Sequence, residues 1–179
     1  MKKCGKCGRE GRIQPIHIQR YEAKKELMGG MNVVLIDAVQ QVICEGCGTI
    51  LRTDIPDMPG LIAAVCVKRS KEGLKLKGEE IRFLRKTAEW PATKVAQELN
   101  AAEETVSRWE NGAQVIGDPN ERIFRWKMCR ALEQKAPGIF WNDNELLSLK
   151  ITPFATEPLV MEFRYAPVKR REQWLEQTA

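Results

Sequence analysis

Four of the six cysteines form two identical units whose spacing suits metal binding. The units are residues 4–8 (CGKCG) and residues 44–48 (CEGCG). Two residues between the cysteines let both sulfurs reach one ion from a tight turn, and the glycine that follows permits the positive φ at which backbone amides turn toward the thiolates. Four thiolates close a tetrahedral site with no open position for water. We therefore predict one structural Zn2+ per chain, held by Cys4, Cys7, Cys44 and Cys47.

Other uses of the cysteines fit the pattern less well. Disulfides are disfavoured where thiols are kept reduced, and a redox pair needs only one such motif. Four cysteines can also hold an iron–sulfur cluster, although two such Cys-x-x-Cys-Gly units favour zinc. His17, the single histidine, could replace a ligand but is expected to be a polar strand residue. Cys66 and Cys129 are expected to be buried free thiols that fill space like small hydrophobic residues.

The composition is that of a soluble globular protein of one or two domains. The chain has 179 residues, of which 43% are hydrophobic and 30% charged. Its longest apolar run, residues 61–67, is too short to span a bilayer, and no apolar stretch follows the basic start, so we expect neither a membrane segment nor a secretory signal and place the protein in the cytoplasm. The net charge of +5 permits nucleic-acid binding without demonstrating it.

The elements that must position the cysteines are two strands and a turn. Residues 14–22 and 32–43 are rich in alternating or β-branched residues, and Gly29-Gly30 supplies a turn between them. So few residues cannot hold a fold by core burial alone, so we expect the metal to supply the missing stability. We assign residues 1–55 to this zinc-binding module and residues 56–74 to a linker helix, with a strand as the alternative for its β-branched part.

Residues 75–138 carry four helical patterns separated by short breaks. We expect helices over 78–89, from Pro91 to Leu99, over 102–110, and from Asp118, as the N-cap, to Pro137. Asn100 and Gly112 are suited to left-handed positions at helix ends. The side chains expected to face inward are Ile81, Leu84, Val106 and Trp109; those expected to face outward are Arg82, Arg85 and Lys86.

A family resemblance rests on residues 81–85 (IRFLR), 95–100 (VAQELN) and 105–112 (TVSRWENG). These segments resemble the helix-turn-helix of the Xre/Cro/cI repressor family. Combined with the paired cysteine module, residues 1–136 are similar to the MqsA (YgiT-type) zinc-finger antitoxin family. The resemblance implies autoregulation and, for some members, neutralisation of a toxin through the zinc module.

In this arrangement the start of the third helix faces base edges in the major groove. Arg108 matches the family residue that reads bases, and arginine can donate two hydrogen bonds to guanine. The predicted DNA-binding residues are Glu103, Glu104, Ser107 and Arg108 at base edges, and Thr93, Lys94 and Asn111 at phosphates. The chain departs from the family at Ala92 and Ala102, and the two glutamates either accept hydrogen bonds from cytosine or weaken DNA binding.

The remaining residues, 139–179, form a C-terminal extension. Strand character at 145–151 and 159–165 predicts a hairpin that packs on the core or across a dimer. The expected fold is therefore α+β: a small N-terminal zinc-bound β module, then an all-α Xre-type helix-turn-helix domain (residues 75–138), then an extension of β character.

The function expected is that of a sequence-specific DNA-binding transcriptional regulator. We predict a repressor, with autoregulating antitoxin as a narrower possibility, that binds double-stranded DNA as a homodimer. The alternative is an interaction protein whose zinc module binds a partner such as a cognate toxin and whose DNA binding is weak; RNA binding is a third, weaker option. We expect no enzyme activity, because no paired acid and base, phosphate loop or open metal site is evident.

Overall fold

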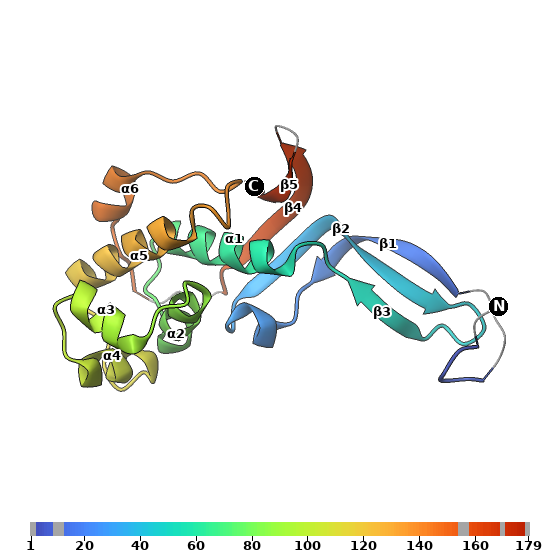
Figure 1. Ribbon diagram of the computed structural model, residues 1–179, viewed down its shortest axis with the longest axis horizontal. Coiled ribbons are helices and arrows are strands. Elements are labelled where there is room, and N and C mark those ends of the chain that lie inside the picture. The colour runs from blue at the N-terminus through green and yellow to red at the C-terminus, as the bar shows by residue number, and fades with distance from the viewer. Residues whose placement is uncertain (1–2, 9–12, 154–157, 169–170, 178–179) are drawn as a thin grey trace.

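The computed structural model describes residues 3–8, 13–153, 158–168 and 171–177. The helices gather at one end, and an arm of β1, β2 and β3 reaches away from them (Figure 1). The strands are β1 (Ile13–Glu22), β2 (Asn32–Cys44), β3 (Ile50–Asp54), β4 (Val160–Val168) and β5 (Arg171–Glu176). The helices are α1 (Met58–Lys71), α2 (Gly78–Thr87), α3 (Ala92–Glu98), α4 (Glu103–Glu110), α5 (Asp118–Leu132) and α6 (Asp143–Leu147), with a 3-10 turn, η1 (Lys25–Met28).

All five strands belong to one mixed sheet organised around β2. β1 pairs antiparallel with one edge of β2 over most of its length. On the other edge, residues 32–36 of β2 pair in parallel with β4, and residues 40–43 pair antiparallel with β3. β5 continues the sheet beyond β4 as an antiparallel neighbour. β3 and β4 therefore share one edge of β2, end to end.

The sheet and the helices bury one common hydrophobic core. Leu35 of β2, Phe163 of β4, Leu61 of α1, and Phe124 and Met128 of α5 are all fully buried in the same cluster. The expected fold, a zinc-bound β module followed by an all-α helix-turn-helix domain and a separate extension, is therefore wrong. The C-terminal strands return to complete the N-terminal sheet, and part of that sheet packs in the core that it shares with the helices.

Helix α1 lies at the centre of this core. Its run of apolar residues, 61–67, is buried almost all round, as is typical of a helix with no polar face. It corresponds to the linker helix expected within residues 56–74, but begins at Met58, before the apolar run. Asp57 caps this start, because its Oδ1 accepts a hydrogen bond from the Gly60 amide at 3.0 Å.

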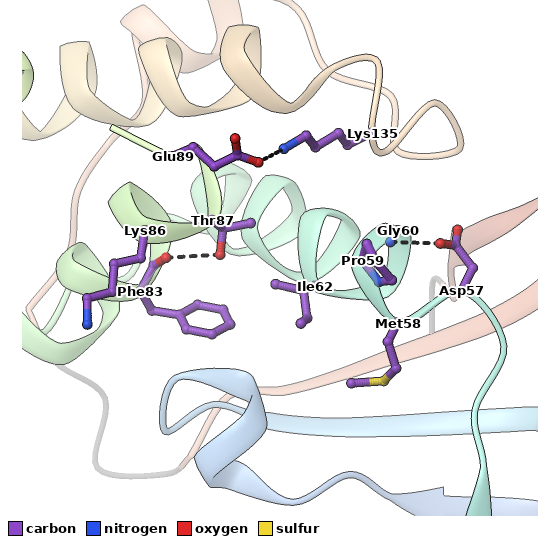
Figure 2. Close-up of a pocket in the computed structure, with 10 residues that line it drawn as sticks. All are labelled: Asp57, Met58, Pro59, Gly60, Ile62, Phe83, Lys86, Thr87, Glu89 and Lys135. Atoms are coloured by element: carbon purple, nitrogen blue, oxygen red, sulfur yellow. Dashed lines mark hydrogen bonds and ion pairs between the residues drawn. The ribbon is translucent and has the colours of Figure 1, made fainter. Parts of the chain in front are cut away.

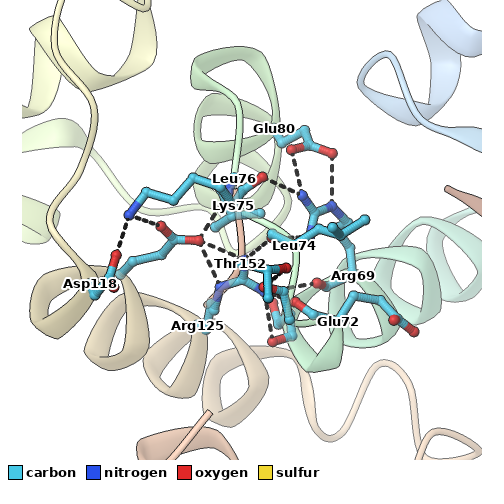
Figure 3. A network of polar contacts seen from close by, with 12 residues as sticks. Arg69, Glu72, Leu74, Lys75, Leu76, Glu80, Asp118, Arg125 and Thr152 are labelled. Carbon is cyan, nitrogen blue, oxygen red and sulfur yellow. Dashed lines mark hydrogen bonds and ion pairs between the residues drawn. The ribbon is translucent and has the colours of Figure 1, made fainter. Parts of the chain in front are cut away.

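Two buried arginines join α1 to α2 and α5 (Figure 3). Arg125 Nη1 donates to the carbonyls of Arg69 and Ser70 at 3.2 and 3.1 Å, in the last turn of α1, and its Nη2 donates to Glu121 at 2.6 Å. Arg69 in turn donates from Nε and Nη2 to both carboxylate oxygens of Glu80, at 2.8 and 2.9 Å. These charge-assisted hydrogen bonds satisfy groups that would otherwise be costly to bury.

Several local expectations were confirmed and others were wrong. Helices α2, α3, α4 and α5, strands β1 and β2, and the left-handed Asn100 and Gly112 lie where they were expected. Residues 143–147 are helical instead of extended, because Asn142 caps α6 by accepting from the Glu145 amide at 2.9 Å. Asp118 is not an N-cap; Gly117 holds that position, and Asp118 pairs with Lys75 at 2.6 Å. Strands β3 and β5 were not expected.

Candidate functional site

The four cysteines of the two repeated units meet at the tip of the arm. Their sulfur atoms all lie within 4.8 Å of one another. Cys4 Sγ is 3.9 Å from Cys47 Sγ, and Cys7 Sγ is 4.0 Å from Cys44 Sγ. Four sulfurs at about 2.3 Å from a central Zn2+ would be separated by about 3.8 Å at tetrahedral angles. The cluster therefore has the dimensions of a site that can bind a metal ion.

The β1–β2 pairing brings the two units together. Ile13, the first residue of β1, pairs with Cys44, so the start of β1 lies directly beside the second unit. Each unit turns tightly on itself: the Gly8 amide donates to the Cys4 carbonyl at 2.9 Å, and the Gly48 amide to the Cys44 carbonyl at 2.7 Å. Both glycines have a φ of +68°, as the sequence predicted for the residue after each second cysteine.

The surroundings of two of the sulfurs, those of Cys4 and Cys47, favour thiolates. Hydrogen bonds from Thr49, whose hydroxyl oxygen is 3.3 Å from Cys47 Sγ, lower the pKa of Cys47 to about 6. Hydrogen bonds from the backbone of Cys7 and Lys6 lower the pKa of Cys4. Because thiolates are the form that binds metal, these contacts prepare the cluster for an ion. Cys4 and Cys44 are buried, whereas Cys47 is exposed.

The other candidate ligands and nucleophiles lie outside this cluster. His17 is on β1, with its Nε2 3.5 Å from Asp37 Oδ1. Cys66 and Cys129 are buried free thiols, as predicted. Burial raises the pKa of each to about 12, so both stay protonated and unreactive near neutral pH.

The second candidate site is the surface formed by α3, α4 and the turn between them. Val106 and Trp109 anchor α4 in the core, as predicted. The short turn uses the left-handed Asn100, and the Ala101 amide donates to the Ala96 carbonyl at 2.9 Å. Ala96 is buried where the two helices approach each other. This turn fixes the angle of α4 and leaves its opposite face open to solvent.

The predicted DNA-binding residues gather on this surface only in part. Glu103, Glu104, Ser107 and Arg108 are exposed on α4, and Thr93 and Asn111 are exposed nearby. Thr93, Glu103 and Glu104 line a common hollow of about 440 Å3 between α3 and α4. Lys94 and Asn111 also make contacts within the chain: Lys94 Nζ lies 4.0 Å from the centre of the Trp90 ring, and Asn111 Oδ1 accepts from the Ala113 amide at 3.1 Å.

A buried ion pair that positions α4 was missed from the sequence. Arg85 of α2 was expected to face outward, which is wrong. Its Nη2 donates to Glu110 Oε2 at 2.9 Å and its Nη1 donates to the Trp90 carbonyl at 2.9 Å. The hydrogen bond to Glu110, whose side chain is only 6% exposed, raises the pKa of Arg85. The sequence offered one indication of this pair: Glu110 directly follows Trp109, a residue of α4 that was expected to face inward.

Comparison with known proteins does not link either site to a protein family. No family model, curated protein or solved structure matches the chain. Within the part of the chain that the structure describes, every helix is too short or too polar to cross a membrane.

Proposed function

We propose that this protein is a sequence-specific DNA-binding regulator in which α3 and α4 act as a helix-turn-helix. The observation that carries the proposal is the exposed face of α4, which presents Arg108 and Ser107 to solvent while Val106 and Trp109 hold the opposite face in the core. A long bidentate donor on a rigid exposed helix suits guanine in the major groove. The net charge of +5 permits it, and the resemblance of residues 81–112 to the helix-turn-helix of Xre-type regulators supports it.

The four-cysteine cluster complements this role as a structural zinc site. All four positions of a tetrahedral ion would be filled by sulfur, so the metal would shape the tip of the arm without activating water. Repression from a palindromic operator would require a homodimer, because one recognition helix reads only a few base pairs. We therefore propose a dimeric repressor with one structural zinc per chain.

Selection of bound DNA from random duplexes tests the proposal directly. Enrichment of a defined motif by the purified protein is the expected result. Arg108→Ala should then weaken binding to the selected site by about 1–3 kcal/mol and binding to random DNA much less. Lys150→Ala, which removes one exposed charge from a loop after α6, is the matched control and should leave specificity unchanged.

The same binding assay also tests the role of the acidic pair on α4, Glu103 and Glu104. Glu104→Gln should lose specificity if the carboxylate accepts from a base, and should tighten binding to all DNA if it only repels phosphates. No enriched motif, or an Arg108→Ala variant that binds both DNAs as the parent does, would contradict docking through α4.

A second candidate function is binding of a protein partner, such as a toxin, by the arm. Ile50 and Leu51 of β3 are 52% and 37% exposed, close in sequence to the cysteine cluster. The exposed Glu103 and Glu104 favour this alternative because they oppose a polyanion. Coexpression with the product of the adjacent gene tests it: Ile50→Lys should abolish copurification, and Arg108→Ala should not.

A further inference from the structure

We propose that a pocket beside the start of α1 binds a small amphipathic monocarboxylate, with its apolar tail inside and its carboxylate against Lys86. The pocket lies where the start of α1, the end of α2 and the segment after α5 approach one another (Figure 2). It is separate from both the cysteine cluster and the exposed face of α4.

The size and lining of the pocket suit an aliphatic chain. Its volume is about 650 Å3, within the usual range for small-molecule sites. Met58, Pro59, Ile62 and Phe83 provide an apolar wall. Burial of methylene groups against such a wall is favourable in proportion to the area removed from water.

The charges at the pocket select the headgroup. Four ionisable side chains line it, and two of them, Glu89 and Lys135, neutralise each other at 2.5 Å. Asp57 caps α1 through the Gly60 amide and keeps its negative charge at the other end of the pocket. Lys86 forms no ion pair with any residue that the structure describes. One exposed cation is thus available at this site, and it would attract an anion.

The polar groups also restrict the other end of the ligand. In the view of Figure 2, Lys86 and Asp57 lie at opposite ends, with Phe83, Ile62 and Met58 between them. A second carboxylate at the tail would approach Asp57 and lose its hydration on an apolar wall. The site therefore favours a monocarboxylate over a dicarboxylate of equal length.

The backbone at the rim is unusual for residues with side chains. Asp57 and Glu89 have φ values of +38° and +59°, in the left-handed region. Both line the pocket. Both conformations are held by helix ends, since Asp57 is the N-cap of α1 and Glu89 lies in the turn that closes α2. These two residues therefore give the pocket a fixed rim.

Methyl NMR of the full chain with hexanoate, octanoate and decanoate provides the test. The methyl resonances of Met58 and Ile62 should shift and saturate, while that of Met161, buried on β4, should not move. Affinity should rise about fourfold per added methylene until the pocket is filled. Decanedioate should bind more weakly than decanoate.

Two variants identify the site. Lys86→Gln should weaken decanoate binding by about tenfold, whereas Lys150→Gln, the same change on a distant exposed loop, should not. Ile62→Trp should fill the pocket and abolish the shift of the Met58 methyl resonance. If that variant fails to fold, the Lys86→Gln variant, changed at an exposed position, still tests the site. Decanol binding as tightly as decanoate, or unsaturable shifts at many methyls, would overturn the proposal. All readings are taken without DNA, so they are independent of the proposed regulatory function.

Discussion

Single residues matter most at the tip of the arm, where three exposed glycines face open space. A Cβ added at Gly5, Gly8 or Gly48 would meet no heavy atom within 4 Å. The four cysteine sulfurs, all within 4.8 Å of one another, are a contact between the two repeated units that one substitution can disrupt. By contrast, Leu35 of β2 is completely buried in the common core.

Loss of one cysteine should accordingly remove the proposed zinc ion without unfolding the protein. Cys44→Ser should lower zinc content, measured by elemental analysis, from about one ion per chain to near zero, because three thiolates bind zinc far more weakly than four. Amide exchange should accelerate at Cys47 and Gly48 but not at Leu35. Cys66→Ala should keep the zinc. An unchanged zinc content in Cys44→Ser would exclude this cluster as the site.

The buried ion pair between Arg85 and Glu110 should contribute more to stability than the exposed contact between Arg82 and Glu110. Arg85→Met leaves the buried Glu110 carboxylate without its main partner and should cost about 3 kcal/mol in chemical denaturation. Arg82 also approaches Glu110, with Nε 3.4 Å from Oε2, but its side chain is 50% exposed. Arg82→Met should therefore cost less than about 1 kcal/mol. Equal losses in the two variants would show that the pair does not anchor α4.

At the scale of elements, local signals in the sequence were sufficient for most helices and for the grouping of the four cysteines. Alternation predicted β1 and β2, and the spacing of the cysteines predicted the cluster. What could not be predicted was which strands pair: nothing local to β4 indicates that Phe163 lies beside Leu35 in a parallel register. The pairing of Arg85 with Glu110 depends in the same way on packing between distant elements.

Strand β5 is joined to α1 by ion pairs between Glu176 and two lysines of α1, and these ion pairs should weaken at low pH. Burial alone would raise the pKa of Glu176, but hydrogen bonds from Lys71 and Lys68, at 2.6 and 3.0 Å, lower it overall. A carboxylate whose pKa is lower in the folded state stabilises the fold above its unfolded pKa of about 4.3, and this contribution is lost as the pH falls through the folded pKa.

The measurement is the difference in unfolding free energy between the parent and Glu176→Gln across pH. The variant should be less stable by about 1 kcal/mol at pH 7, and the difference should vanish from about pH 4 downward. Glu172→Gln, on the exposed part of the same strand, should show no such trend. A difference independent of pH would contradict the charge contact.

At the scale of the whole molecule, the common core predicts that sheet and helices unfold together. Phe163→Ala should cost about 3–5 kcal/mol, because it opens a cavity between β4 and the helices. Far-ultraviolet circular dichroism and tryptophan fluorescence should report the same lowered transition. Val160→Ala, at a position 48% exposed, should change little. A helical transition that stays in place while only the sheet weakens would indicate two independent units.

The parallel contact between β2 and β4 also has a consequence for synthesis of the chain on the ribosome. Residues 32–36 emerge long before residues 160–164, their partners. At a synthesis rate of about 10 residues per second, roughly 10 s pass before β4 emerges, and Val33, Val34 and Leu35 of β2 stay uncovered during that time. An open apolar edge is a template for unwanted strand addition. Nascent chains stalled before β4 should therefore recruit chaperones or aggregate, and full-length chains should refold slowly because this contact closes a long loop.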